Sequence, residues 1–264
     1  IFCTDKTVWA PWRYLKLWHK FHPLQSSCQI IFVQFPGHLN MPIAWLLGKI
    51  YSKPVVFDAF VSLYDTYVFD RQLAIPNSLK AQFYRWIDKI ACTFADVVIT
   101  DTQEHSNYFI HKYHLNSQKF AIVPIGADDT LFKAKSKIYP ERTSPERSRG
   151  SRRAKSKVIV EFHGMFTRTQ GAEYFIRSAK LLESDSRLEF WLIGQSSYYH
   201  LPIKLMHQLK PKNLKYWPRL PLKKLAQKVR QADITVGGHL GLTQKAGRVI
   251  SFKVMQGLAS GNAV

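Results

Sequence analysis

The sequence has 264 residues, 46% of them hydrophobic, which is enough to fill one large core or two ordinary ones. No apolar run reaches the roughly 18 residues that a membrane-spanning helix needs. The 38 basic residues against 18 acidic ones give a formal net charge of +20. Such a field favours an anionic partner, whether a diphosphate-linked substrate, an anionic membrane surface or nucleic acid.

The first half of the sequence alternates short apolar runs with stretches of helical periodicity, as a parallel sheet with crossover helices requires. Helix starts are marked by a cap at Asn77 or Ser78 and by a capping box at residues 101–104. The predicted strands are 30–35, 54–57, 97–100 and 120–123. The predicted helices are 41–51, 79–94 and one that the capping box opens and that runs to about 113.

Residues 133–157 break this alternation, because they are highly charged, rich in Ser and Arg, and without periodicity. The alternation then restarts with a strand at 158–162 and continues to a helix at about 249–259. We therefore predict an α/β protein with two Rossmann-like, doubly wound domains. The domains are residues 1–132 and 158–264, joined by a flexible basic linker at 133–157.

A glycine-bounded loop, residues 164–171, follows the predicted strand 158–162 and enters a helix. Backbone N–H groups at a helix N-terminus attract phosphate, and Arg168 could add further donors. The alternative is that the two glycines only form a tight turn. A second basic group, Lys245 and Arg248, would share a helical face and hold a diphosphate between them, unless it is simply a solvated basic surface.

Asp58 is the candidate catalytic carboxylate, because it directly follows the predicted strand 54–57 and could face the cleft. Asp65 and Asp70 are more typical of turn or helix caps. Carboxylates are otherwise scarce and unpaired, so a hydrolase with two acidic residues gains no support.

Other chemistries find little support in the sequence. The three cysteines have neither C-x-x-C nor zinc spacing, so we expect free thiols and a reducing, cytoplasmic location. The ten histidines include no pair spaced for a metal, and no serine-hydrolase or P-loop motif occurs. No nucleic-acid-binding motif is visible either. We predict no metal site, no cofactor and no specific nucleic-acid partner.

Several stretches together resemble glycosyltransferase family 4, the group 1 glycosyltransferases. The most specific are VPIGAD at residues 123–128 and LASGNAV at residues 258–264. The others are residues 95–102, 164–171, 190–194 and 232–234. The resemblance covers the chain from about Ile30 to its end.

This resemblance implies a GT-B fold, with an acceptor domain first, a nucleotide-sugar domain second and a cleft between them. It also implies a retaining transfer without a metal, from a nucleotide-sugar to a glycan or lipid-linked acceptor, as in polysaccharide biosynthesis. Together with the positive charge, it favours a cytoplasmic enzyme that is peripheral on the inner face of an anionic membrane.

The sequence departs from the family pattern where the diphosphate would bind. Met165 and Gln170 stand where the family has Arg and Lys, and its two glutamates fall on Arg248 and Gln256. A branch of the family with a KAxRVIxxK segment is similar here. That similarity implies that Lys245 and Arg248 form the phosphate clamp.

The same alignment implies roles for further residues. Gly164 and Arg168 would approach the diphosphate, and Gln256 would reach toward the ribose. Residues 217–220, which include Trp217 and Arg219, would border the base.

The ends of the family pattern are missing from the sequence. Its first strand and glycine-rich loop would lie before Ile1, and its closing strand and helix beyond Val264, so we expect a truncated chain with little or no activity. Two alternatives stay open: a non-catalytic GT-B-like binding or scaffold protein, and a sugar-nucleotide epimerase.

Overall fold

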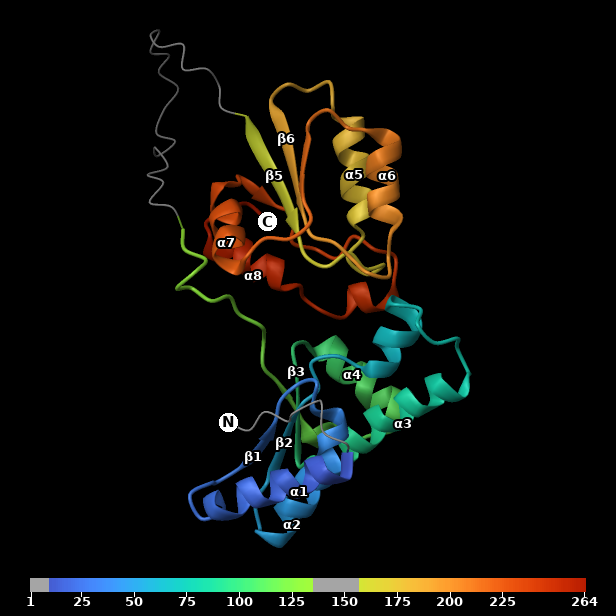
Figure 1. Cartoon of the computed structure of the whole chain (residues 1–264), viewed down its shortest axis with the longest axis vertical. Coiled ribbons are helices and arrows are strands. Elements are labelled where there is room, and N and C mark those ends of the chain that lie inside the picture. The colour runs from blue at the N-terminus through green and yellow to red at the C-terminus, as the bar shows by residue number, and fades with distance from the viewer. Residues whose placement is uncertain (1–9, 135–156) are drawn as a thin grey trace. The chain divides into compact units, whose positions relative to one another are not determined.

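The structure is a computed structural model that describes residues 10–134 and 157–264. The chain forms two compact units, Ile1–Pro124 and Ile125–Val264. Each unit holds a four-stranded sheet in which every pair of neighbouring strands is parallel (Figure 1). The predicted α/β fold with two parallel-sheet units is confirmed. None of the helices in the described ranges combines the length and hydropathy needed to cross a bilayer.

The first unit has its strands in chain order, β1-β2-β3-β4. Its core lies between the sheet and the helices, where Phe57 and Val98 pair in register and are fully buried. The strands are β1 (Ile31–Val33), β2 (Val55–Asp58), β3 (Val97–Thr100) and β4 (Phe120–Ile122). The helices are α1 (Ala10–Phe21), α2 (Met41–Ile50), α3 (Leu79–Phe94) and α4 (Gln103–Tyr113).

The cap predicted for α3 is found in the structure, and the cap predicted for α4 is not. Ser78 caps α3 as predicted, because its side chain accepts a hydrogen bond from Ala81 N at 3.2 Å. The predicted capping box at residues 101–104 is wrong. Thr102 is the cap of α4, and the carboxylate of Asp101 contacts His105 Nδ1 at 2.7 Å instead.

A buried carboxylate on α3 fixes the turn that follows β2. Asp88 accepts hydrogen bonds from Ser62 Oγ at 2.6 Å, Leu63 N at 2.9 Å, Tyr64 N at 3.0 Å and Tyr113 Oη at 2.9 Å. Burial raises the pKa of Asp88 to about 6, although these hydrogen bonds lower it. The network therefore ties the turn to two helices of the unit.

The second unit has the strand order β7-β6-β5-β8. The chain first adds strands on one side of β5 and then crosses to its other side to form β8. The strands are β5 (Val158–His163), β6 (Leu188–Ile193), β7 (Leu214–Trp217) and β8 (Ile234–Thr235). The helices are α5 (Ala172–Leu181), α6 (Leu201–Leu209), α7 (Leu222–Gln231) and α8 (Phe252–Ala259).

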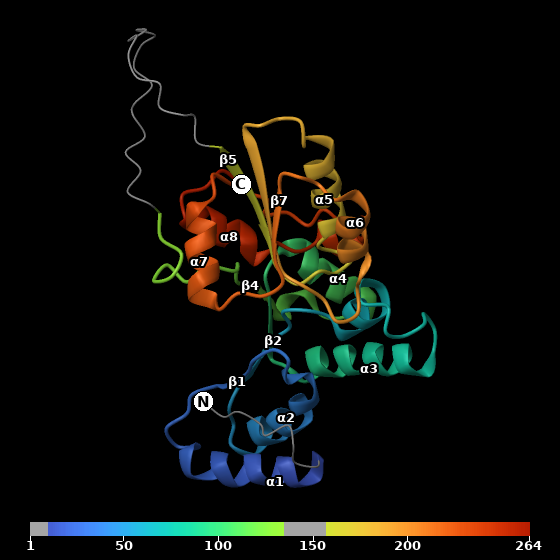
Figure 2. The same cartoon turned by 45° about the horizontal axis from the view of Figure 1, so that its top comes forward.

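Helices cover both faces of this second sheet. In Figures 1 and 2, α5 and α6 lie on one side of the strands and α7 and α8 on the other. Phe162, Phe175 and Leu192 fill the core on the α5 side. This arrangement follows from right-handed crossovers on either side of β5, and it makes the second unit doubly wound.

The division between the units falls just after the VPIGAD stretch begins. Phe132 packs against Ala226 and Val229 of α7, so the chain before the basic segment belongs to the second unit. The predicted linker at 133–157 lies mostly outside the described residues.

Replacing Asp88 tests the buried network. Asp88→Ala leaves the hydroxyl groups of Ser62 and Tyr113 and two backbone N–H groups without their acceptor, so we expect the free energy of unfolding to fall by about 3 kcal/mol or more. Urea denaturation measures this change. The control Lys89→Ala, on the exposed side of the same helix, should stay within about 0.5 kcal/mol of wild type. If both variants lowered the free energy of unfolding equally, the stabilising role of the Asp88 network would be contradicted.

Candidate functional site

The second sheet reverses its strand order between β5 and β8. Ligands of open parallel sheets bind outside the carboxyl ends of the strands at such a point. β5 ends at His163, and the glycine-bounded loop 164–171 follows it directly and leads into α5. The predicted loop is therefore at the position in this unit where a ligand site is expected.

The segment after β8 is hydrogen-bonded to this loop. Leu240 N donates to Gln170 O at 3.3 Å, and Gly241 N donates to Thr169 O at 3.1 Å. The hydroxyl groups of Thr169 and Thr243 also lie 2.9 Å apart in a hydrogen bond. Two segments about 70 residues apart in sequence thus form one surface at the carboxyl ends of β5 and β8.

Two glycines make this close approach possible. Gly171, the N-cap of α5, has a φ of 66°, which disfavours other residues. At Gly241 a Cβ atom would lie 1.7 Å from Arg168 O, far closer than van der Waals contact allows. The loop and the segment after β8 could not touch in this way with larger residues.

A buried lysine from α8 reaches the same loop. Lys253 is 3% exposed, and its Nζ donates a hydrogen bond to Gln170 Oε1. The ammonium lies 4.2 Å from the centre of the Phe162 ring and 3.7 Å from where a Cβ atom at Gly164 would be. Burial lowers the pKa of Lys253 to about 7, and the charge of Glu161 raises it in part. Lys253 is the last lysine of the KAxRVIxxK segment, and it is not among the site residues predicted from the sequence.

A chain of polar side chains runs beside Lys253. Glu161 is fully buried in β5, and its Oε1 lies 2.6 Å from His163 Nδ1. His163 Nε2 in turn lies 2.6 Å from Gln256 Oε1 on α8. The second carboxylate oxygen of Glu161 is buried and has no hydrogen-bond partner among the described residues. His163 therefore orients the side chain of Gln256, the residue predicted to reach a ribose.

This arrangement is suited to binding an anion. The loop leads directly into the N-terminus of α5, where the helix dipole favours negative charge. Lys253 adds an ammonium that is poorly solvated and therefore gains from an anionic partner.

Lys245 and Arg248 were predicted to share a helical face, but they do not lie on an α-helix. Helix α8 begins at Phe252, and the two basic residues belong to a separate 3-10 turn, Gln244–Gly247, of which Arg248 is the C-cap. Thr243, whose hydroxyl group bonds the glycine loop, caps this turn by accepting from Ala246 N at 3.3 Å. Lys245 is buried, with 9% exposure, and Arg248 is half-buried, so neither side chain is simply solvated.

The remaining predicted donor residues lie at the edges of this region. Arg168 is exposed and its guanidinium lies 5.4 Å from the centre of the Tyr199 ring. Trp217, at the end of β7, packs against Lys228 Nζ at 4.2 Å from its ring centre. Arg219 is exposed two residues later. The structure thus brings Gly164 and Gln256 together around His163 and Lys253, and it leaves these three side chains with other neighbours or in solvent.

Asp58 lies in the first unit, at the carboxyl end of β2 as predicted. Burial raises the pKa of its half-buried carboxylate, against hydrogen bonds from the backbone N–H groups of Phe35 and Phe60. The nearby charge of Asp101 raises the pKa further. A raised pKa makes this carboxylate a stronger proton acceptor than an exposed aspartate.

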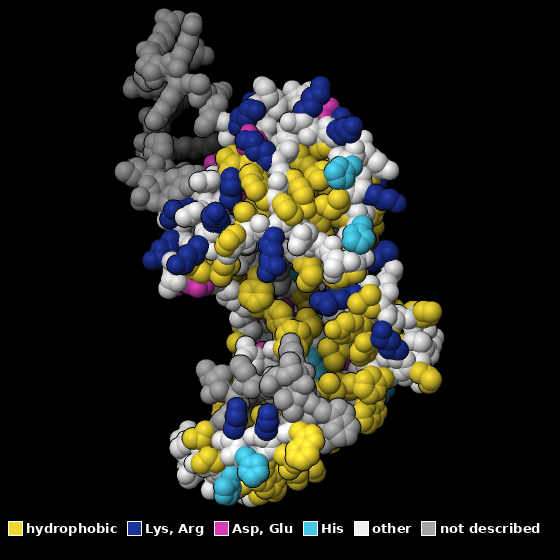
Figure 3. All heavy atoms as spheres, in the orientation of Figure 1, with side chains coloured by type: hydrophobic (Ala, Val, Ile, Leu, Met, Phe, Trp, Pro, Cys, Tyr) yellow, Lys and Arg dark blue, Asp and Glu magenta, His cyan; other side chains and the backbone are white. Residues whose placement is uncertain are grey.

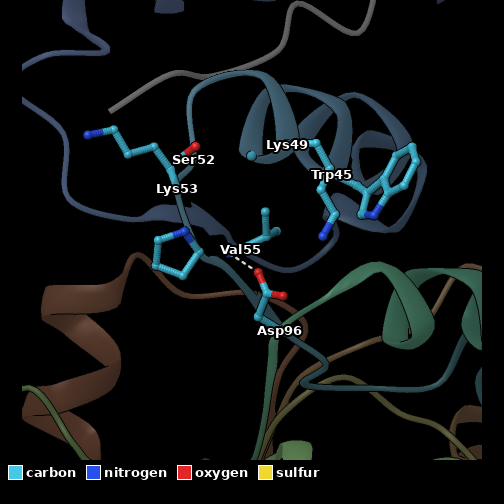
Figure 4. Close-up of a pocket in the computed structure, with 8 residues that line it drawn as sticks. Trp45, Lys49, Ser52, Lys53, Val55 and Asp96 are labelled. Atoms are coloured by element: carbon cyan, nitrogen blue, oxygen red, sulfur yellow. Dashed lines mark hydrogen bonds between the residues drawn. The ribbon is translucent and has the colours of Figure 1, made fainter.

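A cavity of about 360 Å³ in the first unit lies away from Asp58. It is at the amino ends of the strands, where Val55 N donates to Asp96 Oδ2 at 2.8 Å (Figure 4). Trp45 and Lys49 of α2 form another part of its lining. The cavity contains none of the predicted site residues.

No protein-family model matches the sequence, and no curated protein does either. Solved structures match its fold at low identity. HepE of Anabaena in complex with UDP has a TM-score of 0.62 at 14% identity, over 96% of this chain and 62% of that one. Sucrose-phosphate synthase from Thermosynechococcus elongatus has a TM-score of 0.58 at 14% identity, over 90% and 60%. A glycosyltransferase from Rickettsia africae ESF-5 has a TM-score of 0.58 at 14% identity, over 99% and 63%.

These similarities establish the fold. The two-domain GT-B architecture expected from the sequence is confirmed, whereas membership of glycosyltransferase family 4 stays a prediction. The chain spans about three fifths of the length of each of these three structures.

The pKa of Lys253 predicts a specific pH dependence of stability. Between pH 7 and 9 the unfolded chain holds a proton on this lysine that the folded chain has largely lost, so folding becomes more favourable as the pH rises. Relative to Lys253→Met, the wild-type free energy of unfolding should rise by up to about 1.4 kcal/mol per pH unit. Urea denaturation at pH 6 to 9 measures this slope. The control Lys204→Met, at an exposed position of α6, should show the same pH dependence of the free energy of unfolding as wild type. If Lys253→Met showed that same pH dependence too, the burial of the Lys253 charge would be contradicted.

Proposed function

We propose that the chain is a glycosyltransferase of the GT-B type whose second unit binds a nucleotide-sugar. The observation that carries the proposal is the contact between Lys253 and Gln170 at the switch point of the second sheet. The loop there, the N-terminus of α5 and a poorly solvated ammonium together favour a diphosphate.

The position of Lys253 bears on the departure from the family pattern. Gln170 stands where the resemblance would place a cationic side chain, and its amide oxygen accepts from the Lys253 ammonium. Positive charge therefore reaches the loop from α8 instead of from the loop itself. This contact supports a working donor site over a scaffold that has lost it.

The proposal includes the chemistry of the leaving group. A nucleoside diphosphate gains negative charge as the sugar leaves, and fixed cations and backbone dipoles stabilise that charge. Lys253, Lys245 and Arg248 would supply the cations, which is consistent with a transfer that needs no metal. Retention of configuration and a role for Asp58 at the acceptor side belong to the same proposal.

Two further points support a nucleotide-sugar as donor. HepE, which has the same fold, has been solved in complex with UDP and with UDP-glucose. The net charge of +20 fits an anionic donor and an acceptor, glycan or lipid-linked, at an anionic membrane surface.

Binding of UDP tests the donor site directly. UDP should raise the melting temperature of the wild-type chain, because it binds only the folded state. Lys253→Met, Lys245→Ala and Arg248→Ala should each weaken UDP binding about tenfold or more, since each removes one charge-assisted contact. Isothermal titration calorimetry measures the affinity.

The control for these variants is Lys204→Ala, which removes the same charge from an exposed site on α6. It should bind UDP like wild type. If all four variants lost affinity equally, the effect would come from net charge and the donor site would be rejected.

Binding should also take up a proton. At pH 8 the Lys253 amine is mostly neutral in the free protein, and a diphosphate beside it would raise its pKa. We expect up to about one proton taken up per UDP at pH 8, and an affinity that falls by up to about tenfold per unit between pH 7 and 9. Calorimetry in buffers with different ionisation enthalpies measures this uptake. If Lys253→Met took up the same number of protons on binding UDP, the proton would be going to another group.

Product analysis separates transfer from epimerisation. With UDP-glucose, transfer or hydrolysis releases UDP, whereas an epimerase returns an isomeric nucleotide-sugar. UDP binding without either product would favour the non-catalytic alternative.

A further inference from the structure

Helix α3 exposes a stripe of large apolar side chains on its outer face. Leu79, Phe83 and Trp86 follow one another at helical spacing and are 86%, 53% and 58% exposed. The rings of Phe83 and Trp86 stack with their centres 6.4 Å apart. We call Leu79, Phe83 and Trp86 the aromatic face of α3.

The opposite side of the same helix accounts for its packing. Ala81, Ile87, Asp88 and Ala91 are buried there, and Asp88 holds the hydrogen-bond network of the first unit. The aromatic face is therefore not needed to attach α3 to its own unit. Leaving it in water is unfavourable, so it points to a partner.

The segment before α3 enlarges this apolar surface. Phe69, Leu73 and Ile75 are 45%, 45% and 77% exposed. Figure 3 shows hydrophobic side chains gathered where Figure 1 draws α3 and this segment. The surface is continuous with a helix that is rigidly held by its buried side.

Positive charge flanks the aromatic face on both sides. At about 100° per residue, Lys80 lies on one side of the stripe, and Arg85 and Lys89 lie on the other. All three are exposed. The only carboxylates in residues 69–94 are Asp70 and Asp88, and both are buried. The surface thus combines exposed aromatic rings with exposed cations and no exposed carboxylate.

We propose that the aromatic face of α3 docks on the surface of an anionic lipid bilayer. Phe83 and Trp86 enter the headgroup region, where aromatic rings are favoured, and the three cations pair with lipid phosphates. Charge complementarity selects this partner, because a purely apolar protein groove offers no negative charge to Lys80, Arg85 and Lys89. Docking involves only the first unit and does not depend on the donor site.

Vesicle flotation of the full chain tests the proposal. Vesicles of phosphatidylcholine with about 30% phosphatidylglycerol should bind the chain, and vesicles of phosphatidylcholine alone should bind it at least about tenfold more weakly. The double variant Phe83→Ser, Trp86→Ser should lose about tenfold or more in binding to the anionic vesicles. The triple variant Lys80→Gln, Arg85→Gln, Lys89→Gln should bind the anionic vesicles more weakly than wild type. High salt should weaken the binding of wild type in the same way, because it screens the same charges.

Matched controls separate this surface from general effects. Leu181→Ser removes an apolar side chain that is 82% exposed at the end of α5. The triple variant Lys204→Gln, Lys223→Gln, Lys224→Gln makes the same change of net charge on exposed residues of α6 and α7. Both should bind anionic vesicles like wild type.

Three outcomes would overturn the proposal. The first is unchanged vesicle binding by the Phe83 and Trp86 variant, and the second is an equal loss in the charge control. The third is that wild type forms a dimer, seen by sedimentation velocity, that the Phe83 and Trp86 variant does not form, while neither wild type nor this variant binds vesicles. UDP affinity, measured on the same variants, should stay at the wild-type value, so failure of docking and failure of the donor site are distinguishable.

Discussion

The second unit buries the amino group of a lysine where water can scarcely reach it. Removing an ammonium from water costs several kcal/mol, and an amide oxygen, an aromatic ring and one nearby carboxylate offset that cost only in part. Lys253 has these three partners in Gln170, Phe162 and Glu161. A residue held at such a cost is typical of a functional site, because an anionic ligand would stabilise the charge that the fold itself leaves poorly compensated.

The backbone makes this charge usable. The strand order reverses at β5, so the loop after β5 and the segment after β8 leave the sheet side by side. Hydrogen bonds from Leu240 and Gly241 join them, and Gly241 allows an approach that any side chain would block. Helix α8 then carries Lys253 to Gln170 of this loop and Gln256, three residues later, to His163 at the end of β5. One short region of sequence thereby supplies both an ammonium and an oriented amide.

In the first unit, the two sides of helix α3 have different roles. Its inner side carries Asp88, which orders the turn after β2 and so the surroundings of Asp58. Its outer side carries Phe83 and Trp86, which add nothing to that packing. A helix that is fixed on one side can present apolar groups on the other without becoming disordered.

Much of this architecture could be predicted from local sequence. Apolar periodicity determined the two parallel-sheet units, and the cap at Ser78 determined where α3 begins, because both depend on residues close together in the chain. The prediction failed where distant residues compete. Asp101 bonds His105 instead of capping α4, and the segment around Lys245 forms a 3-10 turn because Thr243 is held by the glycine loop.

The candidate site shows the same limit. The sequence alone determined that a glycine loop follows a buried strand, and that basic residues gather after residue 240. Only the tertiary structure decided that Lys253, 83 residues beyond Gln170, is the cation that contacts the loop, and that His163 orients Gln256. The physical reason is that burial and hydrogen-bond partners are set by packing between segments far apart in the chain, which no local pattern encodes.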